Sequence, residues 1–385
     1  MLPNFTLRST RKSIKIPFYS PIVVPGSPKN LWMYPYNLPM SLTLSQLIIL
    51  GTAGFAMSGI LTGPMRRFAI RLGALDIPTV ARKTQVEPVP YLGGVSIAIT
   101  ICVITFTSLL VSNATTSSFF LASHALLPAL LMGIMGLVDD LVGLNPFLRL
   151  AMQTFAGSIA AIFLIKVGTL GLVFSYQYIN VLITILWIVG ICNSINFFDN
   201  LDGGAAGTVA ISTFGISVIA FLEGQNLISA LAIITTGATL GFLLWNKSPA
   251  KIYMGDSGAL FLGVLLAVLT IRLDPESTSN WKALFIPVLL LAVPILDTCI
   301  AVLSRLQRGI SPLQGGQDHL SHRLVRKGMQ RKSAAITLWV LSIIFCLFAV
   351  SIYLWSETIG TPLIIVASSF WLFLFTWFWR IPSEG

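Results

Sequence analysis

Long apolar runs alternate with short polar segments along most of the 385-residue chain. A run of about 20 apolar residues makes a helix long enough to cross the roughly 30 Å hydrocarbon core of a bilayer. The pattern therefore predicts an all-α polytopic membrane protein. We expect eleven transmembrane helices, at residues 44–64, 92–112, 123–138, 147–165, 178–195, 205–222, 227–245, 257–271, 283–303, 333–354 and 359–379.

Composition agrees with a membrane protein. Hydrophobic residues make up 55% of the chain and charged residues only 10%, against about 25% charged residues in a typical soluble protein. The mean hydropathy is +0.85. The four cysteines lie far apart within apolar runs, so we expect them to be small buried hydrophobic residues rather than metal ligands or a disulfide framework.

Basic residues are concentrated in alternate loops between the predicted helices. The net charge is +10, a value that alone is also typical of proteins that bind nucleic acid. One set of loops, with the C-terminus, holds sixteen Lys and Arg residues, whereas the opposite loops and helix ends hold three. Because Lys and Arg accumulate on the cytoplasmic side of membrane proteins, we expect the basic loops to face the cytoplasm, and we expect no nucleic-acid partner. The predicted cytoplasmic segments are residues 65–91, 139–149, 196–204, 246–256 and 304–332.

Residues 1–40 do not fit this charge pattern. They contain five Lys and Arg residues and no Asp or Glu, are rich in Pro and Ser, and would lie on the outer side of the membrane. They are too weakly apolar to be a signal peptide. We interpret them as an extension outside the fold, either a transit-like segment or a stretch upstream of a start at Met40. Residues 41–385 are expected to form a single transmembrane domain.

Acidic residues are rare, and several fall at the predicted cytoplasmic ends of the helices. The chain has only 14 Asp and Glu residues. Asp139 and Asp140 end the third predicted span, Asp199 and Asp202 follow the fifth, and Asp256 precedes the eighth. Segments far apart in the sequence thus bring acids to one face of the membrane. The alternative for any single acid is solvation or helix capping, since Asp202 and Asp256 both precede glycine-rich helix starts.

The adjacent aspartates favour a metal site over separate caps. Two neighbouring carboxylates, such as those of Asp139 and Asp140, repel each other unless a cation compensates. Mg²⁺ is commonly held by one or two carboxylates together with waters and substrate phosphates, so we expect Mg²⁺ as the cofactor, with Mn²⁺ as a substitute. The stretches LDGGAAG and GDSGALFLG add free backbone N–H groups at helix starts, which favour phosphate. The sequence therefore predicts a site for a metal-bound diphosphate at the cytoplasmic membrane boundary.

Cations that suit phosphate groups occur in the same segments. Lys83 precedes a proline-rich turn, Arg149 follows the aspartate pair, and Arg323 lies in DHLSHRL. Each alone is explained as a topology determinant, whereas together they suit a diphosphate and a second phosphate. His319 and His322 are three residues apart and share one face of a helix. We favour phosphate or sugar contact for them over a metal site, because a third ligand is missing.

The ordered motifs resemble one family of membrane enzymes. They are LDIPTVARK…PVPYLGG, GLVDDLVGL…RLAMQ, NSINFFDNLDGGAAG, YMGDSGALFLG, VPILDT and DHLSHRL. Across residues 44–380 these motifs resemble the polyprenyl-phosphate N-acetylhexosamine-1-phosphate transferases, and among them the bacterial undecaprenyl-phosphate GlcNAc-1-phosphate branch. The resemblance implies Mg²⁺-dependent transfer of a sugar 1-phosphate from a UDP-N-acetylhexosamine to a polyprenyl phosphate, with release of UMP. It also implies a multi-pass protein of the inner (plasma) membrane with its active site facing the cytoplasm, and it allows for a homodimer.

The same resemblance assigns roles to individual residues. Asp139, Asp140 and Asp199 are expected to be catalytic. Asp256 and Asn196 are expected to be Mg²⁺ ligands. The expected substrate-binding residues are Lys83, Arg149, Asn200, Asp202, Tyr253, Asp318, His319, His322 and Arg323.

The resemblance also concerns how the donor is recognised. It places Asp202 against the uracil base and Tyr253 stacked on that base. Two departures from the family pattern bear on the sugar: Gln85 and Ser321 stand where the family has histidines, which leaves the identity of the sugar open. Within the family, a phospho-MurNAc-pentapeptide translocase is the alternative. An ion-coupled secondary transporter, in which intramembrane acids mark an ion path, is the alternative from another class.

Overall fold

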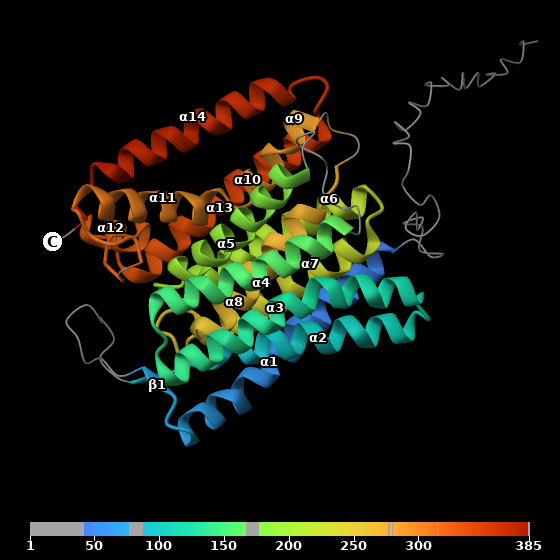
Figure 1. Ribbon diagram of the computed structural model, residues 1–385, viewed down its shortest axis with the longest axis horizontal. Helices are drawn as coiled ribbons and strands as arrows, with labels where there is room; N and C mark the ends of the chain where they lie inside the picture. The colour runs from blue at the N-terminus through green and yellow to red at the C-terminus, as the bar shows by residue number, and fades with distance from the viewer. Residues whose placement is uncertain are drawn as a thin grey trace, which may run out of the picture. The chain divides into compact units, whose positions relative to one another are not determined.

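The computed structural model describes residues 42–76, 88–166, 177–275, 278, 280–313 and 315–383. Lys83 and Gln85, and the predicted extension at residues 1–40, lie outside the described residues. Helices dominate the described chain, and two short strands accompany them (Figure 1). The elements are α1 (Leu44–Arg71), β1 (Leu75–Asp76), β2 (Val89–Pro90), α2 (Gly93–Val111), α3 (Thr116–Val142), α4 (Pro146–Lys166), α5 (Gln177–Phe198), α6 (Gly204–Leu222), α7 (Asn226–Asn246), α8 (Gly255–Arg272), α9 (Asn280–Ala283), α10 (Phe285–Leu290), α11 (Ala292–Gln307), α12 (Leu320–Arg326), α13 (Arg331–Leu354) and α14 (Gly360–Trp379).

The structure confirms the predicted all-α polytopic fold. Among the described residues, nine helices are long and apolar enough to cross a membrane, and one bent pair of helices brings the number to ten. Each of the eleven apolar runs identified in the sequence coincides with helical structure, including the run at residues 147–165, which lies on α4. The number of spans stays a prediction.

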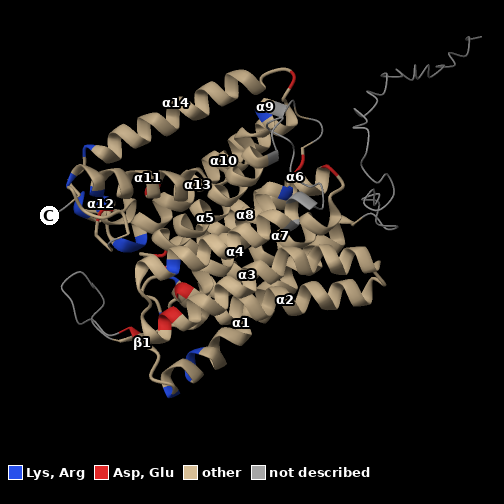
Figure 2. Ribbon diagram, viewed as in Figure 1, with Lys and Arg blue, Asp and Glu red and all other residues tan. Residues whose placement is uncertain are grey.

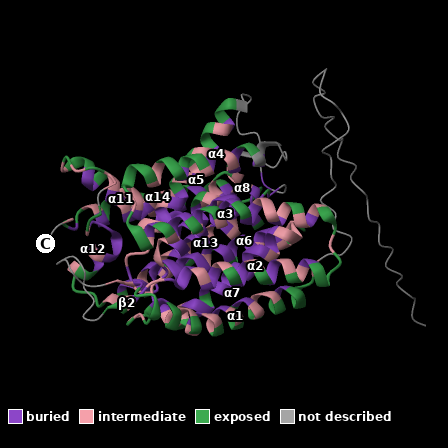
Figure 3. Cartoon of the chain, turned by 60° about the horizontal axis from the view of Figure 1, so that its bottom comes forward, coloured by how far each residue is buried: buried purple, intermediate pink, exposed green. Residues whose placement is uncertain are grey.

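Helix α8 lies in the interior of the bundle. It packs against α3, α5 and α2, and 83% of its apolar window is buried, against 17% for α1. An apolar helix that is buried on all sides needs no polar face, whereas a helix at the edge turns its apolar side chains toward lipid. Figure 3 shows this division, with buried positions inside the bundle and exposed positions along outer helices such as α1. The start of α8, which carries Asp256, is therefore held by several neighbouring helices.

The ninth predicted span is broken, contrary to the single continuous helix expected at residues 283–303. The helical segments Trp281–Leu290 and Ala292–Gln307 meet at an angle of 76°. Pro294 has no N–H to donate to the carbonyl of Leu290, so the helix cannot continue regularly there. The Leu290 carbonyl instead accepts a hydrogen bond from Ser212 Oγ at 2.6 Å, and Trp371 Nε1 donates to the Ala292 carbonyl at 3.1 Å. Helix α6 thus satisfies the carbonyl that Pro294 leaves without a partner, and α14 adds a bond to the first turn of α11.

One end of the bundle, where α12 and the β1–β2 pair lie, carries the candidate site; we call it the charged end. Figure 2 shows Lys, Arg, Asp and Glu gathered there, with further charged residues near α9 and α6 at the opposite end. β1 and β2 pair antiparallel, with Leu75 opposite Pro90. Directly after β2, the N–H groups of Gly93 and Gly94 donate to the carbonyls of Tyr253 and Met254 at 3.0 and 2.8 Å. These bonds fix the loop that precedes α8.

Candidate active site

Three helices bring charged groups together at the charged end. Arg149, in the first turn of α4, places Nη1 2.6 Å from Asp139 Oδ2 at the end of α3. The same nitrogen lies 2.9 Å from Asp256 Oδ2 in the first turn of α8. Asp139 is only 7% exposed, and its second oxygen accepts from the Leu144 N–H at 2.6 Å. One guanidinium therefore joins two carboxylates that are more than a hundred residues apart.

Asp140 fixes the start of α8. Its Oδ1 and Oδ2 accept hydrogen bonds from the backbone N–H groups of Asp256 and Ser257 at 2.9 and 3.0 Å. Such N–H groups have no partner within the helix, and the helix dipole favours a negative charge beside them. The close fit requires two glycines. A Cβ on Gly255, whose φ is +75°, would lie 2.7 Å from Asp140 Oδ2, and a Cβ on Gly136 would lie 2.4 Å from the Asp256 carbonyl oxygen.

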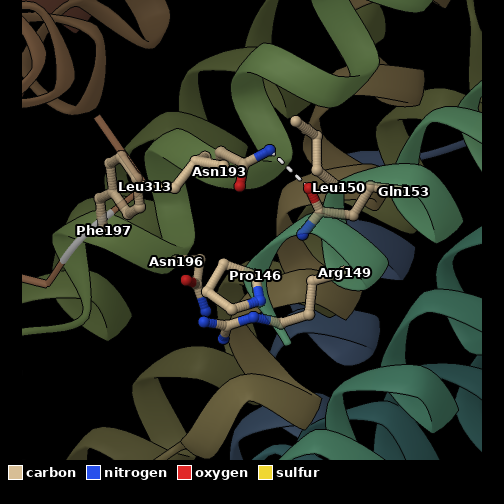
Figure 4. Close-up of a pocket in the computed structure, with 8 residues that line it drawn as sticks. All are labelled: Pro146, Arg149, Leu150, Gln153, Asn193, Asn196, Phe197 and Leu313. Atoms are coloured by element: carbon tan, nitrogen blue, oxygen red, sulfur yellow. Dashed lines mark hydrogen bonds between the residues drawn. The ribbon is translucent and has the colours of Figure 1, made fainter. Parts of the chain in front are cut away.

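Helix α5 adds amide groups to this cluster. Asn196 Nδ2 donates to Asp256 Oδ1 at 2.8 Å. One turn earlier, Asn193 Nδ2 donates to Gln153 Oε1 of α4 at 2.6 Å (Figure 4). The hollow beside these side chains encloses about 320 Å³, part of it open to solvent. Its lining is half polar and half apolar, and consists of Pro146, Arg149, Leu150, Gln153, Asn193, Asn196, Phe197 and Leu313.

The loop after α5 carries Asp199, Asn200 and Asp202. Burial raises the pKa of Asp199 to about 7, and the negative charges of Asp256, Asp140 and Asp202 add to this rise. Asn200 donates to the Phe197 carbonyl at 2.6 Å and accepts a hydrogen bond from the hydroxyl of Ser321 in α12. Asp199 therefore lies in the field of the acid cluster, whereas Asn200 connects the loop to α12.

The loop before α8 carries Tyr253. Burial raises the pKa of Tyr253 to about 12, and the charge of Asp202 contributes, so these two side chains share one neighbourhood. Asp202 Oδ2 accepts from the Ala250 N–H at 3.2 Å. Asn246 is 2% exposed and joins the loop after α5 to the loop before α8. Its Oδ1 accepts from the Gly203 N–H and its Nδ2 donates to the Ile252 carbonyl, both at 3.0 Å. Asn246 is not among the residues that the sequence pattern predicts for the site.

Asp318 and His319 belong to a buried network before α12. Arg305 binds both oxygens of Asp318, at 2.8 and 2.7 Å, and Arg308 adds a third bond at 2.8 Å. His319 Nδ1 lies 2.7 Å from Asp297 Oδ2, and Asp297 also accepts from the Leu320 N–H. Burial acts to raise the pKa of Asp318. This effect is outweighed by the hydrogen bonds and charge of Arg305 and by the charge of His319, so the pKa stays below its usual value.

Arg323 anchors this segment rather than facing the hollow. It is 1% exposed, and its guanidinium donates to the Asp318 carbonyl, to Ser304 Oγ and to the carbonyls of Phe378 and Ile381. Asp318 is equally buried, at 1%. For these two residues the contacts fit a positioning role better than the substrate contact that the sequence suggested.

His322 lines a second hollow at the charged end. This hollow encloses about 480 Å³ and also contains Asn200, Ser321 and Arg331. Burial lowers the pKa of His322 to about 4, and the charge of His319 lowers it further. His322 is therefore neutral near pH 7. A neutral imidazole can both donate and accept hydrogen bonds, which suits contact with sugar hydroxyls.

Of the predicted catalytic and metal-binding residues, Asp139, Asp140, Asp256 and Asn196 meet through direct or shared contacts. The described residues contain no group of three or more His, Cys, Asp or Glu arranged to hold a metal. A site completed by substrate phosphates fits better, because Mg²⁺ needs only one or two protein carboxylates. The position of Arg149 Nη1 between two carboxylates marks a place where positive charge is favourable. The donor set thus fits a divalent cation held by Asp256 and Asn196, a role that stays a prediction.

Four further residues complete the arrangement and were not among the predicted site residues: Gln153, Asn193, Asp297 and Arg305. Helical spacing is the signal that could have found Gln153 and Asn193. Gln153 follows Arg149 by four residues, and Asn193 precedes Asn196 by three, so each shares a helix face with a predicted site residue.

The fold and the site define a membrane-embedded enzyme whose polar chemistry lies at one end of an apolar helical bundle. Residues 122–274 match the model of the family described as glycosyl transferase family 4. A probable undecaprenyl-phosphate N-acetylglucosaminyl 1-phosphate transferase of Bacillus subtilis is 32% identical over 316 residues, covering 80% of this chain and 84% of the relative. A decaprenyl-phosphate N-acetylglucosaminephosphotransferase of Mycolicibacterium smegmatis is 33% identical, covering 77% and 80%.

A match over a shorter stretch is a phospho-N-acetylmuramoyl-pentapeptide-transferase of Streptococcus pneumoniae, 34% identical over 201 residues, which cover 49% of this chain and 61% of the relative. The chain belongs to glycosyl transferase family 4 and is a sugar-phosphate transferase. This confirms the family and the branch that the motifs indicated.

Proposed function

We propose that this protein transfers N-acetylglucosamine 1-phosphate from UDP-N-acetylglucosamine to undecaprenyl phosphate or a related polyprenyl phosphate, with release of UMP. The observation that carries the proposal is the meeting of Asp139, Arg149, Asn196 and Asp256 at the charged end of a membrane bundle. The names of the Bacillus and Mycolicibacterium relatives support the sugar and the lipid acceptor.

The proposed reaction joins two anions. A bond forms between an acceptor phosphate oxygen and the phosphorus that carries the sugar, and the bond from that phosphorus to the oxygen of UMP breaks. Proteins promote such transfers mainly by positioning and by neutralising charge. Arg149 would neutralise phosphate oxygens, Asp140 would hold the start of α8 in place, and Asp256 with Asn196 would hold Mg²⁺. When bound, Mg²⁺ supplies further charge neutralisation at the diphosphate.

The charged end suits a reaction between a dissolved donor and a lipid-anchored acceptor. Asp139, Asp140 and Asp256 lie at helix ends rather than halfway along the helices. The hollow at Arg149 combines amide groups with apolar side chains such as Phe197 and Leu313. We propose that this end faces the cytoplasm of a cell whose plasma membrane holds the protein, because the excess of Lys and Arg lies in its loops.

The coverage of the relatives favours N-acetylglucosamine over MurNAc-pentapeptide. The chain covers 84% and 80% of two relatives named for N-acetylglucosamine, but 61% of the relative named for N-acetylmuramoyl-pentapeptide. The match to the relatives named for N-acetylglucosamine therefore extends over a larger share of both chains.

The test incubates the purified protein with Mg²⁺, undecaprenyl phosphate and a panel of UDP-sugars, and measures UMP release. We expect UDP-N-acetylglucosamine to be the best donor and UDP-MurNAc-pentapeptide to give no product. Asp256→Ala and Asp139→Ala should abolish release while the protein still inserts and folds. Glu223→Gln, at the end of α6, serves as the control and should retain activity.

Either of two results would contradict this proposal. One is near-normal turnover by purified Asp256→Ala or Asp139→Ala protein. The other is UMP release that does not depend on the polyprenyl phosphate.

A further inference from the structure

Arg149 occupies an unusual position for a residue that is to meet phosphate. A single guanidinium nitrogen lies 2.6 Å from Asp139 Oδ2 and 2.9 Å from Asp256 Oδ2. Both distances are those of charge-assisted hydrogen bonds. Asp256 Oδ1 is occupied as well, by the amide of Asn196. Each oxygen of the Asp256 carboxylate thus contacts a protein group, and one of these groups carries a positive charge.

Placing a divalent cation and this guanidinium together beside Asp256 Oδ2 costs free energy. Like charges a few ångströms apart repel strongly where water is scarce. Arg149 is also about 30% exposed in its side chain, as is Asp256, and the hollow beside Arg149 offers the guanidinium another environment, lined by Gln153 and Asn193. The geometry therefore allows Arg149 to leave Asp256 without unfolding a helix.

We propose that Arg149 is a displaceable counter-ion, which competes with the divalent cation for the Asp256 carboxylate and keeps the acid cluster neutralised while no substrate is bound. This inference rests on the proposed function, because it takes Asp256 as the metal ligand. It adds that the ion pair seen here opposes metal binding in the absence of the diphosphate. The donor phosphates, which attract both cations, would let the metal and Arg149 act together.

Competition and support predict opposite changes in metal affinity when Arg149 is removed. If Arg149 merely holds Asp256 in place, its removal should weaken metal binding. If Arg149 competes, its removal should strengthen metal binding in the absence of substrate even though transfer is lost. The two effects of one substitution then run in opposite directions.

The experiment measures binding of Mn²⁺ alone to the purified full-length protein by electron paramagnetic resonance. For Arg149→Gln we expect a Kd about tenfold lower than that of the wild type, because one nearby positive charge has been removed. We expect UMP release by the same protein to fall. Arg308→Gln makes the same change in net charge beside Asp318, away from Asp256, and should leave the Mn²⁺ affinity unchanged.

An unchanged or higher Kd for Arg149→Gln, in protein with a normal thermal unfolding profile, overturns the inference. Asp256→Asn separates this failure from that of the proposed function. If Asp256→Asn weakens Mn²⁺ binding and Arg149→Gln does not strengthen it, the metal assignment stands and the competition falls. If Asp256→Asn has no effect on Mn²⁺ binding, both fall.

Discussion

Gln153 and Asn193 form an amide pair that aligns two other side chains. Gln153 lies one turn beyond Arg149 on α4, and Asn193 lies one turn before Asn196 on α5. The hydrogen bond of 2.6 Å between the two amides holds these helices in the register at which Arg149 and Asn196 both contact Asp256. Gln153 is 5% exposed, so this bond is largely shielded from water.

We therefore expect Gln153→Met to lower turnover about tenfold, since small displacements of positioned groups cost up to roughly a hundredfold in rate. The lost hydrogen bond should cost about 0.5–1.5 kcal/mol of stability. UMP release and thermal unfolding measure the two effects. Thr154→Val, on the next residue, is the control, because its hydroxyl donates within its own helix, to the Leu150 carbonyl. Equal turnover in the two variants would show that the amide pair does not position the site.

The residues that the sequence could predict are those with a charge that the membrane makes costly. Asp139, Asp140 and Asp256 were identifiable because an acid at the end of an apolar run needs a reason to be there. The partners of these residues were not identifiable. Ser212 on Leu290, or Asn246 between two loops, depends on how helices pack across the bundle, and no one-dimensional pattern records such contacts.

At the scale of elements, the segment between α11 and α12 is held by ion pairs rather than by regular structure. Asp318 is 1% exposed and Arg305 2% exposed, and they meet through two hydrogen bonds. The ring of Phe197 on α5 lies 5.3 Å from the Arg305 guanidinium, which connects this segment to the site. A buried pair of this kind leaves an uncompensated charge when one partner is removed.

We expect Asp318→Asn to destabilise the protein by about 3–5 kcal/mol. Since the pKa of Asp318 is held below its usual value, its contribution is fully present above about pH 4 and is lost only as the pH falls further. The destabilisation should therefore be the same at pH 6 and pH 9, measured as the shift in Tm in detergent. Glu357→Gln, on a side chain that is 78% exposed, should leave the Tm unchanged. A shift that varies between these pH values would argue against a permanently ionised pair.

The helices themselves were predictable, but one of their breaks was not. Apolar length alone located the helical runs, because a bilayer tolerates only segments that satisfy their own backbone. The bend at Leu291 escaped prediction because proline is tolerated inside membrane helices when neighbours satisfy the freed carbonyl. Whether Ser212 would do so for Leu290 was not visible in the sequence.

At the scale of the whole molecule, orientation follows from which end holds the site. Ser311 lies in the exposed stretch after α11 at the charged end, and Asn113 lies in the exposed turn between α2 and α3. If the charged end faces the cytoplasm, a cysteine at position 311 should react with a membrane-impermeant maleimide only in inside-out vesicles. A cysteine at position 113 should react only in right-side-out vesicles. The opposite labelling pattern would reverse the proposed orientation.

Arg323 ties the segment that carries His319 and His322 to the carbonyls of Phe378 and Ile381. The ribosome must therefore deliver the end of α14 before that segment can be fastened, long after the acid cluster has been synthesised. We expect nascent chains that stop short of Ile381 to insert fully and yet bind donor poorly. Such an enzyme acquires its activity only after α14 has been synthesised.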